Sequence, residues 1–295
     1  MNISLCTISF RHQLISLGQI AQWAAHHRFQ GIELWGVHAK NLIDRPEYDI
    51  DWLQSKNLRV PMISDYLPVQ GERKVGLHEA SKLCRLTQSW RAQKLRTFAG
   101  DRASGAVPPD ERRAWVTRMR ELCEVVAAHG LYLVVETHPN TLADTPASTL
   151  QLVEEIDHPA LRLNFDVIHV WEAGAEPLQV FRELKPFIAH MHLKNVTARE
   201  LLPVFAPANV YAPMGSRAGM VRLFDGAFDF QSFLRSVMAE TQLSWDDMDA
   251  SLEWFGPDVL STLAHDGDLL MQFDSEHRSA SRSLAASPNA SARST

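Results

Sequence analysis

The chain has 295 residues, 45% of them hydrophobic and 22% charged, which is enough to bury one large core. Its net charge of -6 and its pI near 6.1 argue against a nucleic-acid-binding surface. No apolar run approaches the roughly 18 residues of a membrane span, and the N-terminus lacks the basic start of a signal peptide. Cys6, Cys84 and Cys123 form no CxxC pair, which predicts reduced thiols in a cytoplasmic protein.

Short apolar runs alternate along the chain with segments of helical periodicity. We expect eight strands, at residues 3–8, 31–35, 59–64, 95–99, 131–137, 161–166, 188–193 and 251–255. Between them lie amphipathic segments, such as the one that Thr145 and Pro146 begin and the one behind Asp229. This alternation predicts a parallel (β/α)8 TIM barrel, one catalytic domain over residues 1–273. A doubly wound sheet is the alternative, but no glycine-rich phosphate loop follows any expected strand.

The last part of the chain has a different composition. Residues 274–295 are dominated by Ser and Ala, with no aromatic residue after Phe273. Such a segment buries too little apolar surface to offset its ordering entropy, so we expect a disordered tail. The sequence leaves open whether the protein forms a homo-oligomer.

Four polar side chains stand at or near the C-terminal ends of expected strands: Glu136, Asp166, His192 and Glu253. In a TIM barrel these ends meet at the mouth that carries the active site. In LRLNFD the polar residues share one face, whereas a buried parallel strand is usually apolar on both. Three carboxylates and an imidazole at one point suit Mn²⁺, Mg²⁺ or Co²⁺ better than a thiolate-type zinc site does. Four unrelated polar residues at strand ends remain the plainer interpretation.

The residues beside these four refine the expected chemistry. His138 lies two residues beyond Glu136 and faces the same cavity, either as a general base or as a histidine hydrogen-bonded at a loop entrance. Lys194 lies two residues beyond the strand-end histidine and either meets a substrate anion, stabilises a developing oxyanion or is solvated. His169, three residues after Asp166, either orients that carboxylate from behind or has a structural role.

Arg96 shares one face of its expected strand with Lys94 and Phe98, inside the barrel. An unpaired buried guanidinium is costly, so Arg96 needs an anionic partner. Glu33 is the default partner within the chain, and a bound carboxylate is the other.

A long segment without clear periodicity, residues 196–228, is rich in Pro, Gly and Ala. Loops of this length are uncommon in compact domains and often act as lids. Tyr211 and Arg217, with Gly215 and Gly219, are placed to close over the mouth, and a solvated connector is the alternative.

Several motifs resemble one enzyme family. The runs GIELWG, MISDYL, RTFAG, ETHPNTL, DVIHVWE, NVYA and SLEWFG are similar to those of the metal-dependent 3-dehydroshikimate dehydratases of catechol-siderophore biosynthesis. That family lies within the xylose-isomerase-like TIM-barrel superfamily, and the resemblance covers residues 1–270. ETHPNTL and SLEWFG are distinctive, whereas DxxH and HxK alone would mark only the superfamily.

The resemblance implies a site and a reaction. One divalent ion, Mn²⁺ first with Mg²⁺ or Co²⁺ as alternatives, would be held by Glu136, Asp166, His192 and Glu253. His138 would be the base, and the substrate, a small carboxylate, would lie among Arg96, Lys194, Tyr66 and Trp171. The implied reaction is dehydration of 3-dehydroshikimate to protocatechuate, with removal of the proton next to the ketone and loss of the β-hydroxyl.

Other functions use a similar set of residues. A sugar or inositol-derivative isomerase, epimerase or dehydratase would bind neutral polyols and give Arg96 and Lys194 no carboxylate to meet. A DNA-repair endonuclease would need further histidines and a basic face, which the net charge of -6 disfavours. The hypothesis that does not involve catalysis is a barrel that binds an aromatic or sugar acid as a sensor. The presence of the base and of all four expected ligands disfavours it.

Overall fold

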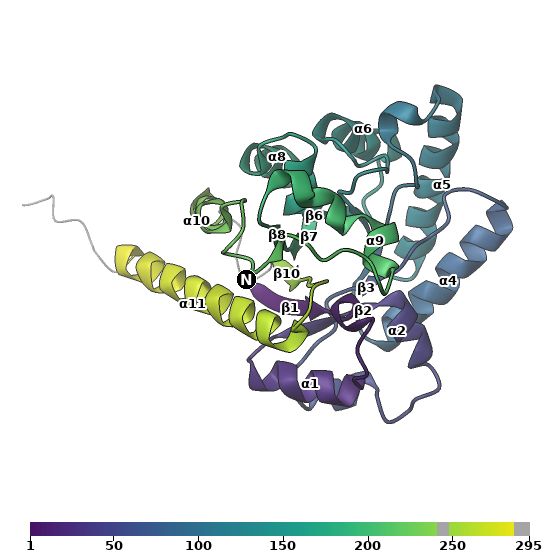
Figure 1. Ribbon diagram of the computed structural model, residues 1–295. Helices are drawn as coiled ribbons and strands as arrows, with labels where there is room; N and C mark the ends of the chain where they lie inside the picture. Colours follow the sequence, from purple (N-terminus) through teal and green to yellow (C-terminus); the bar gives the residue numbers. More distant parts are fainter. Residues whose placement is uncertain (241–247, 286–295) are drawn as a thin grey trace, which may run out of the picture.

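The computed structural model describes residues 1–240 and 248–285. Eight parallel strands close into a barrel in the order β1-β10-β7-β6-β5-β4-β3-β2, which confirms the predicted TIM barrel (Figure 1). The barrel strands are β1 (Asn2–Cys6), β2 (Gly31–Trp35), β3 (Ile63–Ser64), β4 (Lys94–Thr97), β5 (Tyr132–Glu136), β6 (Leu161–Asp166), β7 (Ile188–Leu193) and β10 (Asp249–Leu252).

Helices surround the barrel, as Figure 1 shows, and short 3-10 turns join some of them to the strands. They are η1 (Thr7–Phe10), α1 (Leu17–His26), α2 (Gly36–Asn41), α3 (Ile50–Gln54), α4 (Arg73–Ser89), η2 (Ser104–Ala106), α5 (Pro109–Ala128), α6 (Pro146–Ile156), α7 (Val167–Glu172), α8 (Pro177–Leu184), η3 (Arg199–Phe205), α9 (Pro207–Tyr211), α10 (Phe230–Glu240) and α11 (Val259–Ala285). Across the residues that the structure describes, no helix is long and apolar enough to cross a membrane.

Helix caps form where the sequence predicts them. The Thr145 side chain accepts a hydrogen bond from the backbone of Ser148 at the start of α6, with Pro146 in the first turn. Asp229 accepts from the backbone of Ser232 at 2.9 Å at the start of α10. Each cap satisfies an amide that the first helical turn leaves without a partner.

Side chains alternate along β6 between the lumen and the helices. Phe165 packs outward against Phe181 of α8 and Phe233 of α10. Asn164 and Asp166, on the opposite parity, are fully buried inside the barrel. Because successive side chains of a strand point to opposite faces, the polar parity of LRLNFD lines the lumen as predicted.

Two strands differ most in extent from the prediction. β3 is confined to Ile63–Ser64, although Arg59 forms an isolated parallel bridge with Gly31. Pro61 lies between, and proline offers no amide to a ladder, so regular pairing is interrupted there. β10 covers Asp249–Leu252 instead of residues 251–255, so Glu253 lies just beyond the last strand residue.

The segment expected as a lid has structure of its own. β8 (Asn195–Val196) and β9 (Met220–Val221) pair antiparallel, and η3 and α9 lie between them. Two arginines hold the end of α9: Arg11 Nε donates to the carbonyl of Val210 at 2.6 Å, and Arg217 Nη2 donates to that of Ala212 at 2.9 Å. The segment is therefore anchored across the mouth.

The C-terminal helix continues further than the sequence suggested. α11 runs to Ala285, so residues 274–285 are helical where we expected a disordered tail. The N-terminal amine of Met1 pairs with Asp274 at 3.0 Å, which fixes the helix beyond Phe273 to the start of β1. Alanine has the highest helix propensity, so the alanines of this segment favour a helix despite its low hydrophobicity. The remainder of the expected tail, 286–295, lies outside the described residues.

Candidate functional site

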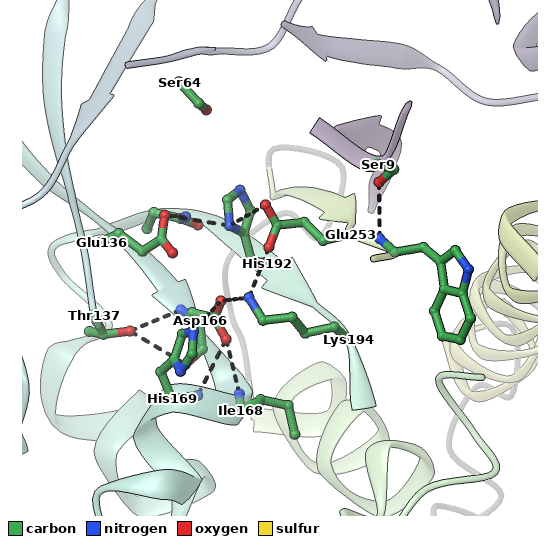
Figure 2. A network of polar contacts seen from close by, with 12 residues as sticks. Ser9, Ser64, Glu136, Thr137, Asp166, Ile168, His169, His192, Lys194 and Glu253 are labelled. Carbon is green, nitrogen blue, oxygen red and sulfur yellow. Dashed lines mark hydrogen bonds and ion pairs between the residues drawn. The ribbon is translucent and has the colours of Figure 1, made fainter. Parts of the chain in front are cut away.

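The carboxylates of Glu136, Asp166 and Glu253 lie around His192 (Figure 2). Glu136, Asp166 and His192 offer donor atoms that all lie within 4.8 Å of one another. His192 Nδ1 lies 3.6 Å from Glu136 Oε2 and 3.5 Å from Glu253 Oε1. The structure thus brings together the four side chains predicted as ligands, each from a different strand or strand end.

His192 Nδ1 is buried and has no hydrogen-bond partner among the described residues. Metal–donor distances of about 2.0–2.2 Å place the donors of one ion about 3 to 4 Å apart, which is the spacing seen around Nδ1. Three carboxylates and one imidazole are a donor set for a divalent cation, so these residues fit a metal ion.

Lys194 lies among the same carboxylates. Its ammonium donates to Asp166 Oδ2 and, at 2.8 Å, to Glu253 Oε2. Burial would lower the pKa of Lys194, but the Asp166 and Glu253 carboxylates hold it above its usual value. Asp166 Oδ1 accepts from the backbone amides of Ile168 and His169 and so caps α7. The cap fixes this carboxylate and leaves Oδ2 facing the centre.

Arg96 corrects one expectation. Its partner is Glu136, with Nε 2.9 Å from Oε2, and not Glu33. This ion pair is not aligned as a hydrogen bond, so buried Nε and Nη1 have no acceptor within the described ranges. The guanidinium lies under the Tyr66 ring and against Phe98, 5.3 and 4.8 Å from the ring centroids. Such a desolvated planar fork is suited to a carboxylate.

His138 presents one free ring nitrogen to the site. Its Nδ1 lies 2.7 Å from the carbonyl oxygen of Pro139, and because a carbonyl only accepts, Nδ1 carries the proton. The other nitrogen, Nε2, is then the basic one. Burial, with a smaller contribution from neighbouring His169, lowers the pKa of His138 to about 3, so the ring is neutral at pH 7.

His169 packs beside His138, with ring centroids 4.4 Å apart. Its Nδ1 lies 2.8 Å from Glu172 Oε2, and its Nε2 lies 3.8 Å from Asp166 Oδ2. The structure therefore places His169 in contact with both the predicted base and a predicted ligand.

A small cavity of about 30 Å³ lies beside these groups. It is lined by residues near the strand ends and by residues of the long segment 196–228, among them Tyr66, Arg96, Glu136, His138, His169, Lys194, Phe205, Val210, Tyr211, Glu253 and Phe255. The hydroxyls of Tyr66 and Tyr211 contact each other across it, and Tyr211 stacks on Trp35 at 5.9 Å. The aromatic rings Phe205 and Phe255, which the sequence did not single out, form walls beside Lys194. Tyr211 confirms that the long segment reaches the mouth.

Trp171, expected beside the substrate, is not among the residues that line this small cavity. It packs against Phe228 at 5.8 Å and under the guanidinium of Arg199 at 4.8 Å. Residues two apart on a helix point in nearly opposite directions, so α7 cannot turn both His169 and Trp171 toward the site.

Glu33 is a neighbour of the centre that we considered only as a partner for Arg96. It is fully buried, with its oxygens 3.1 Å from His192 Nε2. Its lumen-facing place in the strand GIELW was the signal that the sequence offered.

The fold and the site define a TIM-barrel enzyme with a buried centre of carboxylates and imidazole. The chain belongs to the xylose isomerase-like TIM barrel family, whose model matches residues 21–278. It is 44% identical over 262 residues to a 3-dehydroshikimate dehydratase of Bacillus anthracis, covering 87% of this chain and 91% of that protein, which confirms the resemblance seen in the motifs.

Solved structures agree with this assignment. A probable 3-DHS dehydratase involved in petrobactin synthesis in Bacillus anthracis superimposes with a TM-score of 0.86 at 42% identity, over 92% of this chain and 99% of that one. A xylose isomerase-like TIM barrel protein of Mycobacterium smegmatis, in complex with magnesium, has a TM-score of 0.66 at 19% identity, over 94% and 97% of the two chains, and shares the fold.

Proposed function

We propose that this protein is a divalent-metal-dependent lyase that dehydrates 3-dehydroshikimate to protocatechuate. The observation that carries the proposal is the meeting of Glu136 and Glu253 at Nδ1 of His192, with Asp166 within 4.8 Å in the same cluster. A buried arginine with unpaired N–H groups, Arg96, lies beside it. The 44% identity to a 3-dehydroshikimate dehydratase over most of both chains supports the substrate.

Glu136, Asp166, His192 and Glu253 are the proposed metal ligands. The donors are oxygen-rich, which favours Mn²⁺, with Mg²⁺ and Co²⁺ as alternatives. When bound, a divalent cation would stabilise the negative charge that develops on the ketone oxygen and so acidify the adjacent C–H bond.

His138 is the proposed base. Its Nε2 takes the proton from the carbon next to the ketone, while the hydrogen bond from Nδ1–H to the Pro139 carbonyl holds the ring in place. The electron pair of that C–H bond forms the new double bond as the β-hydroxyl departs. The hydroxyl leaves as water with the proton that His138 returns to it, and tautomerisation of the remaining ring gives protocatechuate. No oxidant is needed.

The two cationic side chains of the site, Arg96 and Lys194, are proposed to contact different groups of the substrate. Arg96 is proposed to bind the ring carboxylate, because its Nη1 is buried without an acceptor in the described part of the chain. Lys194 already contacts Asp166 and Glu253, which favours a place beside the ketone oxygen over one at the carboxylate. Tyr66 covers Arg96 and completes the substrate pocket. A contact between Trp171 and the substrate stays a prediction.

The test is an assay of the purified protein with 3-dehydroshikimate and Mn²⁺, following the absorbance of the catechol product. Chelation should abolish turnover, and added Mn²⁺, Co²⁺ or Mg²⁺ should restore it. A panel of neutral sugars and inososes assayed alongside separates the proposal from the rival isomerases and dehydratases. Turnover of a neutral polyol without turnover of 3-dehydroshikimate would overturn the substrate assignment.

The proposal also covers the pathway that uses the product and the compartment in which the enzyme acts. The relative in Bacillus anthracis is involved in petrobactin synthesis, so we propose that the protocatechuate made here enters a siderophore. All three cysteines are free and buried, which is compatible with the cytoplasm as the site of action.

A further inference from the structure

We propose that Glu33 is a positioning residue of this centre: it holds His192 in the one tautomer and ring orientation that turn Nδ1 toward the three carboxylates. The inference rests on the metal site of the proposed function and concerns a residue that contributes no ligand to it. In Figure 2, Ser64, which contacts Glu33, lies on the side of His192 away from Asp166.

Glu33 lies beside donors on two other strands, β7 and β3. Its side chain is completely buried, and its oxygens lie 3.1 Å from His192 Nε2 and 3.2 Å from His190 Nε2. The hydroxyl of Ser64 also donates to it. An ionised carboxylate only accepts hydrogen bonds, so the proton of His192 is held on Nε2. The lone pair of the ring is then on Nδ1, which faces Glu136 and Glu253.

The direction of these hydrogen bonds is set deeper in the barrel. Lys94 Nζ donates to the carbonyl of Ala189 at 3.0 Å and to Asp249, and it lies 3.2 Å from His190 Nδ1. An ammonium group has no lone pair, so His190 Nδ1 must accept. The proton of His190 is therefore on Nε2, which faces Glu33 and, at 2.9 Å, the oxygen of Ser251.

One consistent order of donors results. Lys94 donates to His190, the Nε2–H of His190 lies 3.2 Å from Glu33, and His192 donates to Glu33 from the other side. If Glu33 lost its acceptor oxygens, His192 could carry its proton on either nitrogen and could rotate. Carboxylates behind a ligating histidine typically change metal affinity by about 10- to 100-fold, because they fix the tautomer and raise the basicity of the ring.

The experiment measures Mn²⁺ binding directly, by titration calorimetry, in the wild-type chain and in the variants Glu33→Gln and Glu33→Ala. We expect Glu33→Ala to weaken Mn²⁺ binding about 10- to 100-fold. Glu33→Gln keeps one acceptor oxygen and should lose less. Ser251→Ala is the matched control: Ser251 pairs in register with His192 and contacts His190, yet leaves Glu33 in place, so Mn²⁺ affinity should stay within about threefold of the wild type.

A second measurement needs no variant. In the Mg²⁺-loaded chain labelled with ¹⁵N-histidine, His192 should show a protonated Nε2 and an unprotonated Nδ1. Equal Mn²⁺ affinity in all three proteins, or a proton on Nδ1 of His192, would overturn the role of Glu33 while leaving the metal site standing. A wild-type chain that binds no divalent ion would overturn the proposed function itself, and this inference with it.

Discussion

Replacing Arg96 with lysine tests how the site recognises its substrate. The change keeps a positive charge beside Glu136, 2.9 Å from the present Nε, but removes the planar fork and its unpaired Nη1. A buried hydrogen bond to a charged group contributes about 1.5–3 kcal/mol, and each 1.4 kcal/mol is tenfold in an equilibrium constant. We therefore expect kcat/KM to fall about 10- to 150-fold.

The loss should appear mainly in KM. The ring carboxylate takes no part in bond making, so Arg96 binds it about equally in the ground and transition states. Steady-state kinetics with 3-dehydroshikimate and saturating Mn²⁺ measure both constants. Calorimetry checks that Mn²⁺ affinity is kept, since Arg96 also contacts a proposed ligand. Arg199→Lys is a matched control, because Arg199 packs on Trp171 outside the cavity and should leave KM unchanged. An Arg96→Lys enzyme with the wild-type KM would refute the carboxylate contact.

Three further outcomes follow from the same geometry. His138→Ala should retain Mn²⁺ binding and lose about 10²- to 10⁴-fold in kcat, and near-normal turnover in this variant would contradict its role as base. Burial is the main cause that lowers the pKa of His138 to about 3 and that of His190 to about 4. Below pH 6.5 these two histidines therefore bind protons in the unfolded chain but stay neutral in the folded chain. The free energy of unfolding should thus fall from pH 6.5 toward pH 4, by up to about 1.4 kcal/mol per pH unit for each histidine; urea unfolding in EDTA measures this, and a flat profile would count against it. Truncation after Phe273 removes the ion pair between Asp274 and the Met1 amine and should lower the Tm by a few degrees, with kcat unchanged, as calorimetry and the assay would report.

Much of the fold and of the centre could be predicted because both depend on short-range regularities. Strand alternation decides which side chains face the lumen, and the closure of a parallel barrel brings strand ends together. Those two rules place Glu136, Asp166 and His192 at one point without any knowledge of distances, and the structure agrees.

The remaining details depend on geometry that the sequence does not express. From the sequence, Arg96 could pair with more than one carboxylate. Only the arrangement of the neighbouring strands determines that its partner is Glu136 and not Glu33. Trp171 follows the loop-like run after β6, and a helical turn there rotates it away from the cavity. α11 pairs through Asp274 with the amine of Met1, which lies at the opposite end of the chain.

The contact between the Tyr66 and Tyr211 hydroxyls bears on the speed of the enzyme. With this bridge formed, the space beneath is about 30 Å³, against roughly 300–1,000 Å³ for typical small-molecule sites. A substrate can therefore enter only if residues that line this space move, and the two tyrosines are among them. Solvent viscosity should then slow turnover whenever this movement, and not the chemistry, is the slowest step.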